Sequence, residues 1–202
     1  MSPRPAFLAR LLVVLLLPGS PVLAQNAPSP GWRADAQNGC KVWDAVPGPD
    51  ETVSWTGPCR DGLAEGRGVV QWFGGGKPIE RDEGEFHAGK LTGHGVSVFP
   101  DGSGYDGQWR DSLPNGRGVY HWAGGNRYEG EWLNNRRHGT GTETFARGDR
   151  YEGQWRNDRP EGSGTLTAAD KQIYSGDWSH GCFEDGPRHA SVITTHKQCG
   201  FE

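Results

Sequence analysis

Apolar and polar residues alternate along short segments of this chain, which is the pattern of a β-strand with two different faces. Tyr128, Gly130 and Trp132 lie on one side of such a segment, and glutamates occupy the two positions between them. A polar turn is expected over residues 134–138, followed by a return strand that starts at Gly139. The alternation therefore predicts a β-hairpin with one face of rings and glycines and one charged face.

The same hairpin pattern recurs every 23 residues. The central glycines of its first strand are Gly84, Gly107, Gly130, Gly153 and Gly176. Each return strand opens with Gly-x-Gly, and the first glycines of these pairs are Gly93, Gly116, Gly139 and Gly162. A fixed period of this size is typical of a repeat array, in which one short unit cannot bury its own surface and must stack on its neighbours.

The composition favours large rings packed on glycine over an ordinary two-layer core. Of the 202 residues only 33% are hydrophobic, whereas 33 are glycine and nine are tryptophan. Glycine weakens a strand, and it is tolerated where a bulky group, here an aromatic ring of an adjacent strand, approaches closely. We therefore predict an all-β fold, an elongated single-layer antiparallel meander of about five to six hairpins over residues 55–178.

The N-terminal residues have the features of a signal peptide, predicted to span residues 1–24. Arg4 and Arg10 precede an apolar run over residues 11–17, and small residues ending at Ala24 form a cleavage site. We expect an exported protein, periplasmic or secreted, that is cleaved near Ala24. The rest of the chain is expected to divide into a flexible lead (25–39), an N-terminal cap (40–54), the repeats (55–178) and a C-terminal cap (179–202).

Four cysteines are consistent with an oxidising compartment. They allow three pairings, but a repeat array would keep its two ends apart. We therefore expect the local disulfides Cys40–Cys59 and Cys182–Cys199, one at each end of the sheet, where they also protect the open edges.

Charge and motifs exclude several classes of function. The formal net charge of −4 becomes more negative once Arg4 and Arg10 are removed, which argues against a nucleic-acid partner. The Gly-x-Gly pairs lack the strand–loop–helix context of a phosphate loop, and the seven histidines show no metal-binding spacing. We predict no catalytic residue, no metal site and no cofactor, and hence no enzyme.

The repeated motif resembles a known family. The segment from Tyr128 to Trp132, followed by Gly139 and Gly141, is similar to the MORN repeat (membrane occupation and recognition nexus). About five such units, with a partial sixth that starts at Tyr174, cover roughly 60% of the chain.

One early unit departs from this motif, because Asp82 stands at its tyrosine position and Phe86 at its tryptophan position. The resemblance implies a curved single-layer sheet with an aromatic-lined groove. It implies a scaffold, a dimerisation module or a partner- or lipid-associated segment rather than a chemical activity.

These observations favour a non-enzymatic exported scaffold that presents an aromatic face to an unidentified protein partner or to a second copy of itself. The residues expected on that face are Tyr105, Trp109, Trp122, Tyr128, Trp132, Tyr151, Trp155, Tyr174 and Trp178. Three alternatives stay open at this point. The rings can instead cover their own glycines and form the core, or the protein can be an envelope module that binds glycans or contacts a lipid surface. The protein can also be a small hydrolase, which would require a cleft that holds an acid or base of shifted pKa.

Overall fold

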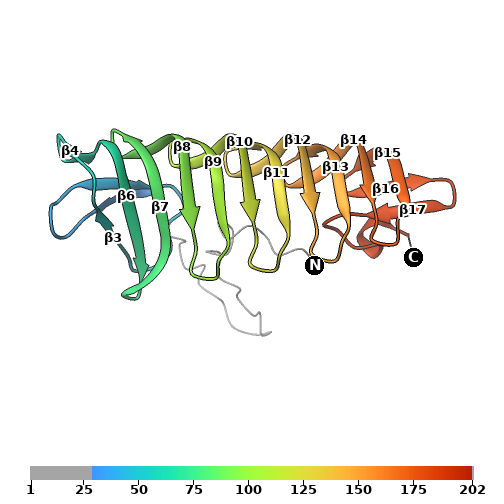
Figure 1. Cartoon of the computed structure of the whole chain (residues 1–202), viewed down its shortest axis with the longest axis horizontal. Helices are drawn as coiled ribbons and strands as arrows, with labels where there is room; N and C mark the ends of the chain where they lie inside the picture. Colours follow the sequence, from blue (N-terminus) through green and yellow to red (C-terminus); the bar gives the residue numbers. More distant parts are fainter. Residues whose placement is uncertain (1–28, 202) are drawn as a thin grey trace, which may run out of the picture. The chain divides into compact units, whose positions relative to one another are not determined.

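The computed structural model describes residues 29–201 (Figure 1). The chain divides into two compact units. The N-terminal unit comprises residues 29–100 and 109–113, and the C-terminal unit comprises residues 101–108 and 114–201. The predicted signal peptide lies outside the described residues. No helix within residues 29–201 has the length and apolar character needed to cross a membrane.

The N-terminal unit holds two sheets. The smaller sheet has the strand order β1 (Gly31–Ala34), β2 (Lys41–Asp44), β5 (Leu63–Ala64) and β4 (Cys59–Arg60). The larger one has the antiparallel order β3 (Glu51–Trp55), β6 (Gly66–Gly74), β7 (Lys77–His87) and β8 (Lys90–Val98). Within the small sheet β2 and β5 run parallel, so the unit is more than a plain meander.

Strand β1 lies within the stretch 25–39 that was predicted to be a flexible lead, of which residues 25–28 lie outside the described residues. Asp35, which follows β1, accepts the backbone N–H groups of Trp55 at 2.9 Å and of Gln37 at 2.8 Å. Burial alone would raise the pKa of Asp35, but hydrogen bonds from Trp55, Gln37 and Asn38 outweigh it and hold the pKa below its usual value. This buried carboxylate therefore links the segment that follows β1 to the end of β3 by a hydrogen bond.

The small sheet is also fastened to the first hairpin turn of the repeats. The Gly89 N–H donates to the Ala64 carbonyl at 2.8 Å, and the Trp43 N–H donates to the Gly89 carbonyl at 2.8 Å. A side chain at Gly89 would run into the Trp32 ring and the Lys41 carbonyl. The glycine thus lets the turn between β7 and β8 approach the cap closely.

The C-terminal unit confirms the predicted meander of consecutive antiparallel hairpins. Its strands follow one another in sequence order: β10 (Leu113–His121), β11 (Arg127–Leu133), β12 (Arg136–Thr144), β13 (Arg150–Arg156), β14 (Arg159–Thr167), β15 (Ile173–Ser179), β16 (Cys182–Asp185) and β17 (Arg188–Ser191). Strand β9 (Gly104–Arg110) contributes residues 104–108 to this unit. A short 3₁₀ helix, η1 (Lys197–Cys199), lies near the C-terminal end.

The hairpin turns are tighter than predicted. Between β11 and β12 the turn is made by Asn134 and Asn135 alone, with φ of 48° and 65°, so the return strand starts at Arg136 and not at Gly139. Asparagine tolerates this left-handed conformation, which two-residue hairpin turns require. The Asn135 N–H also donates to the Pro114 carbonyl of the preceding hairpin at 3.0 Å. The same bond joins Asp158 to Arg137 at 3.1 Å and Gly181 to Pro160 at 2.9 Å.

The first glycine of each Gly-x-Gly pair marks a β-bulge rather than the start of a strand. Pairing of β11 with β12 shifts between Gly130 and Glu131, and Gly139 has φ of 55°. The Glu131 carboxylate accepts the Thr140 N–H at 3.0 Å and the Thr140 hydroxyl, and these hydrogen bonds lower the pKa of Glu131. The first glycine of the pair is therefore needed for the backbone geometry of the bulge. The second glycine, Gly141, instead leaves room for the Tyr128 ring.

Both predicted disulfides are present, Cys40–Cys59 in the N-terminal unit and Cys182–Cys199 in the C-terminal unit. Each joins cysteines that are close in sequence, 19 and 17 residues apart, and the first links the N-terminal cap to the start of the repeats.

Candidate functional site

In three repeats of the C-terminal unit the tyrosine, Tyr105, Tyr128 or Tyr151, covers a pair of glycines. Gly130 and Gly141 face each other across β11 and β12, and a side chain on either would overlap the Tyr128 ring. The Tyr128 hydroxyl donates to the Glu131 carbonyl at 3.1 Å. Tyr105 and Tyr151 have the same arrangement, and burial raises the pKa of all three phenols above the ordinary value.

The tryptophan of each repeat links neighbouring hairpins. Trp155 donates its indole N–H to the Gly141 carbonyl at 3.1 Å, and its ring lies edge-on to Tyr128 with ring centres 5.2 Å apart. Equivalent bonds join Trp132 to Gly118, Trp178 to Gly164 and, in the N-terminal unit, Trp109 to Gly95. Within each unit, rings, glycines and carbonyls thus follow the same packing pattern.

The structure places the predicted aromatic face in the core. Eight of its members are at most 5% exposed: Tyr105, Trp109, Trp122, Tyr128, Trp132, Tyr151, Trp155 and Trp178. Only Tyr174 is partly exposed. The expected open row of aromatic rings is therefore not present at these positions, because the tyrosines cover glycines and the tryptophans pack between neighbouring hairpins. The alternative in which the rings form the core describes this geometry, and partner contact through them stays a prediction.

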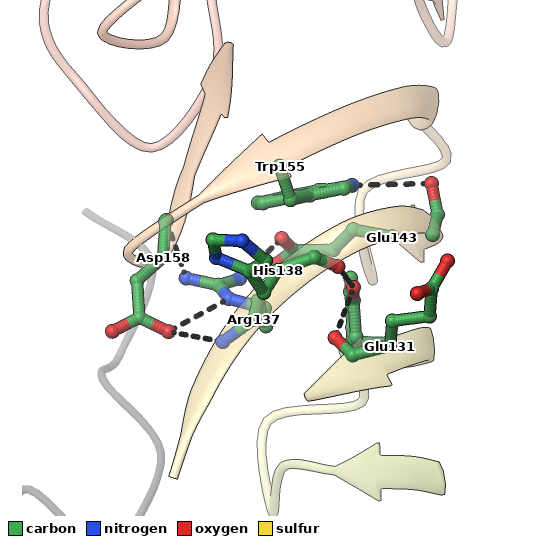
Figure 2. A network of polar contacts seen from close by, with 8 residues as sticks. Glu131, Arg137, His138, Glu143, Trp155 and Asp158 are labelled. Carbon is green, nitrogen blue, oxygen red and sulfur yellow. Dashed lines mark hydrogen bonds and ion pairs between the residues drawn. The ribbon is translucent and has the colours of Figure 1, made fainter. Parts of the chain in front are cut away.

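A buried charged network, which sequence reasoning missed, lies within the aromatic core (Figure 2). Arg137 is 3% exposed and donates to the fully buried Glu143 at 2.6 Å. It also donates to the Asp158 carboxylate at 3.4 Å and to the Asp158 carbonyl at 2.9 Å. The centre of the guanidinium lies 4.7 Å from the Trp155 ring, close enough for a cation–π interaction.

The N-terminal unit contains a cavity of about 40 Å³ with aromatic walls and acidic groups. Its aromatic lining is Trp43, Trp72, Phe86 and Trp109, and its carboxylates are Asp44, Glu80 and Asp82. The Trp72 indole N–H donates to Asp82 at 2.7 Å, and the Ser97 hydroxyl donates to Glu80 at 2.9 Å. All three carboxylates are at least nine-tenths buried.

The sequence model of the MORN repeat matches residues 60–77, 83–104, 105–127, 128–150 and 151–172, together more than half of the chain. The chain belongs to the MORN-repeat family. Repeats of this family are typically non-catalytic scaffolds that bind proteins or membranes.

No curated protein sequence matches the chain. Among solved structures, the chain is similar to the TCP domain of SAS-4 (dCPAP) of Drosophila melanogaster, solved in complex with a proline-rich motif of Ana2 (dSTIL). The two share 14% identity over 84% of this chain and 99% of that one, with a TM-score of 0.34. At this TM-score the likeness supports no argument.

The MORN period explains the N-terminal cavity. Asp82 stands 23 residues before Tyr105, and Ser97 stands 23 residues before Tyr120, so two ring positions of the repeat carry small polar side chains. The glycines that a tyrosine would cover here meet Leu91 and Trp109 instead. The acidic cavity therefore occupies a place where later MORN units are filled with rings.

The same period shows how Arg137 and Glu143 could have been found from sequence. Their equivalents one repeat earlier are Pro114 and Tyr120, which are buried. Glu143 was a visible signal, because the neighbouring repeats carry Tyr120 and Leu166 at its position. Arg137 was hidden because residues 134–138 were read as a turn.

A second hollow of about 260 Å³ lies in the C-terminal cap. Trp178, Phe201 and the Cys182–Cys199 disulfide line it, together with Asp177 and Glu184. Among residues 29–201, no cluster of three or more histidine, cysteine, aspartate or glutamate side chains has the arrangement of a metal site.

Proposed function

We propose that this chain is an exported, non-enzymatic MORN scaffold that binds a protein partner. The observation that carries the proposal is the aromatic and acidic cavity in the N-terminal unit. The repeats bury their own rings, and the cavity is a concave, partly polar surface of the kind that receives a side chain. The alternative partners are a second copy of the chain, an envelope glycan and a lipid surface. Crosslinking and retention assays distinguish them from a different protein.

Export is supported by the basic, apolar and small residues that end at Ala24 and by the two disulfides, since disulfides persist in oxidising compartments. Expression of the full chain with a C-terminal tag, followed by N-terminal sequencing of the product, tests it. A new N-terminus near Gln25 is expected. An uncleaved product that stays inside the cell with reduced cysteines would contradict export.

Partner binding is tested by placing a photo-crosslinking amino acid at Ala45, a half-buried residue that lines the cavity. The matched control carries the same amino acid at Glu129, which is exposed on the opposite, charged face of β11. A protein adduct at Ala45, absent at Glu129, is expected in cells that make the full chain.

The other outcomes contradict the proposed partner in different ways. An adduct with the mass of two chains would show self-association. An absence of protein adducts, together with retention of the chain on cell-wall polysaccharide or on lipid vesicles, would favour the glycan or lipid alternative.

A further inference from the structure

We propose that the C-terminal unit binds an acidic segment of the protein partner along the edge where its two-residue hairpin turns lie. The surface consists of three exposed arginines, Arg136, Arg156 and Arg159, and the exposed side chain of Leu133. We call these four residues the arginine edge. Such a contact rests on the proposed protein-binding function and adds to it a second surface with its own chemistry.

The three arginines lie on one face of neighbouring strands. Arg156 ends β13 and Arg159 begins β14, and the two are directly opposite each other across the hairpin. Arg136 begins β12, which pairs with the other side of β13. The next residue toward the interior of each strand is buried, so alternation directs all three arginines to the solvent-exposed face. Because adjacent strands are about 4.8 Å apart, the arginines span about 10 Å.

The positive charge of the arginine edge has no partner within residues 29–201, where none of its arginines forms an ion pair. The acids closest to it in sequence are already engaged. Figure 2 shows Asp158 turned toward the buried Arg137, to which it is hydrogen-bonded. The Glu161 carboxylate accepts the His180 N–H at 2.8 Å. The edge therefore presents a cationic surface to an incoming anion.

Arginines at the opposite end of the same strands are paired. Arg127 forms an ion pair with Glu129 at 2.8 Å, and Arg150 forms one with Glu152 at 2.6 Å. All four residues lie on the exposed face that also carries the arginine edge. The uncompensated charge is therefore a property of the turn edge and not of the whole face.

The 23-residue period identifies an acid that the turn edge lacks. In the N-terminal unit, Lys90 stands two repeats before Arg136 and forms an ion pair with Asp111 at 3.0 Å. The residue two repeats after Asp111 is Asn157, which has no charge. The N-terminal unit thus neutralises its cation from within, whereas the C-terminal unit leaves the equivalent cation for a partner.

Leu133 indicates that the anion belongs to a polypeptide. It lies directly opposite Arg136 in the pairing of β11 with β12 and is 41% exposed. Protein interfaces combine arginines with apolar side chains, whereas a free phosphate ion uses only the cations. Two carboxylates at alternate residues of an extended segment are about 7 Å apart, which fits within the span of the three arginines.

The rest of the exposed face argues against an anionic membrane. Away from the turns it carries ion pairs such as Arg150–Glu152, which have no net charge. Surfaces that bind anionic lipid typically present clusters of about four to eight cations. A flat bilayer would cover the neutral pairs without gaining attraction from them, whereas a narrow acidic segment contacts only the arginine edge.

The binding test applies two dye-labelled peptides to the full chain, and fluorescence anisotropy measures their dissociation constants. The acidic peptide has the sequence Glu-Leu-Glu-Ser-Glu with blocked ends, and its control carries glutamine in place of each glutamate. We expect saturable binding of the acidic peptide that weakens as the salt concentration rises, and about tenfold weaker binding of the glutamine peptide. Equal binding of both peptides would overturn the inference, because charge would then not be recognised.

The decisive variant is Arg156→Gln/Arg159→Gln, which removes two exposed charges from the arginine edge. We expect about tenfold weaker binding of the acidic peptide, with an unchanged circular dichroism spectrum and melting temperature. The matched control, Arg127→Gln/Arg150→Gln, removes two paired arginines from the same face and should change binding by less than about twofold. Equal loss in both variants would mean that only overall charge matters and would overturn the inference.

Asn157→Asp tests the missing acid directly, because it gives this turn the carboxylate that Asp111 supplies to Lys90. Aspartate suits the left-handed backbone there, since φ is 52° at Asp111 and 49° at Asn157. We expect about threefold weaker binding of the acidic peptide, because the new carboxylate competes for Arg136. Unchanged binding would place the peptide elsewhere and would overturn the inference.

Two further probes distinguish other anions from an acidic peptide. Inorganic phosphate should not displace the acidic peptide at constant ionic strength, and phosphatidylglycerol vesicles should not retain the chain. Displacement by phosphate would mean that any small anion suffices. Retention on the vesicles that is lost in Arg156→Gln/Arg159→Gln would assign the arginine edge to a membrane. Either result would overturn the acidic-segment contact.

Crosslinking from Leu133 separates this inference from the proposed function. If a protein adduct forms at Ala45 but not at Leu133, protein binding stands and the contact at the arginine edge is wrong. If the Leu133 adduct is lost in Arg156→Gln/Arg159→Gln and kept in Arg127→Gln/Arg150→Gln, both stand. If the acidic peptide binds but neither position gives a protein adduct, the anion-binding surface stands and the protein partner is wrong.

Discussion

The two units build the same β-hairpins but fill them differently. In the C-terminal unit Tyr105, Tyr128 and Tyr151 cover the paired glycines, and an internal arginine neutralises the buried Glu143. In the N-terminal unit Leu91 and Trp109 cover the glycines, and acids border a cavity. The difference teaches that the repeat requires its glycines to be covered but does not require tyrosine to cover them. A unit released from tyrosine has space for a binding site.

The largest expected effect is that of Tyr128→Ala. Removing this ring uncovers two glycines and deletes a buried hydrogen bond, so the free energy of unfolding should fall by about 4 kcal/mol. Asp82→Ala, at the equivalent position of the N-terminal unit, should cost only about 1–2 kcal/mol through the lost Trp72 hydrogen bond. Urea unfolding followed by tryptophan fluorescence measures both, and equal losses would mean that the two positions have the same role.

Arg137→Leu should lower the free energy of unfolding by about 3 kcal/mol, because it leaves Glu143 buried without its cation. Arg137→Leu/Glu143→Leu replaces the pair with the leucine found at equivalent positions of other repeats, Leu91 and Leu166. This double variant should be at least as stable as the native chain. If the double variant were less stable than Arg137→Leu, the ion pair would be needed for more than charge balance.

Asp82→Tyr restores the tyrosine of the motif in the N-terminal unit. It should nevertheless lower the free energy of unfolding by about 2 kcal/mol, because Leu91 and Trp109 already occupy the space over Gly84 and Gly95. Thermal unfolding by circular dichroism is the measurement. A rise in melting temperature would show that the cavity simply lacks its ring.

Ionisation of the buried tyrosines should have the smallest effect on stability near neutral pH. In alkali, it should distinguish the two units most clearly. Burial raises the pKa of Tyr105, Tyr128 and Tyr151, so the unfolded chain loses these protons at lower pH than the folded chain. The stability that they contribute is full below about pH 10 and declines as the pH rises further. The N-terminal unit has no tyrosine and lacks this contribution.

Hydrogen exchange at increasing pH, with tyrosinate absorbance as the second signal, checks this prediction. Exchange should become faster in β11 to β14 first, together with the appearance of tyrosinate. Titration of all tyrosines before any increase in exchange would show that the rings are accessible without unfolding.

Sequence reasoning predicted the features that depend on local backbone geometry. The 23-residue spacing of glycines and rings requires successive hairpins, and short loops bring Cys40 to Cys59 and Cys182 to Cys199. The turn was predicted over residues 134–138, but Asn134 and Asn135 alone form it. The prediction was too long because the polar residues that follow a turn resemble turn residues.

Features that depend on contacts between residues distant in the sequence could not be predicted from the sequence. Strand β1 has no alternating pattern and is held by Asp35 reaching Trp55. Alternation tells on which side of a strand Trp132 lies but not what covers that side, so an aromatic core was predicted as an open face. The acidic cavity was marked only by Asp82 as a departure from the motif, and its depth depends on Trp43 from the cap.

The bond from each turn to the hairpin before it limits how such a protein changes in evolution. The N–H groups of Asn135, Asp158 and Gly181 each find their acceptor in the preceding repeat. Gain or loss of one whole repeat preserves a donor for every acceptor inside the array, whereas a gain of a single residue within a strand turns its rings toward the solvent. Descendants of this chain can therefore lengthen or shorten by whole repeats, while each repeat keeps its own length.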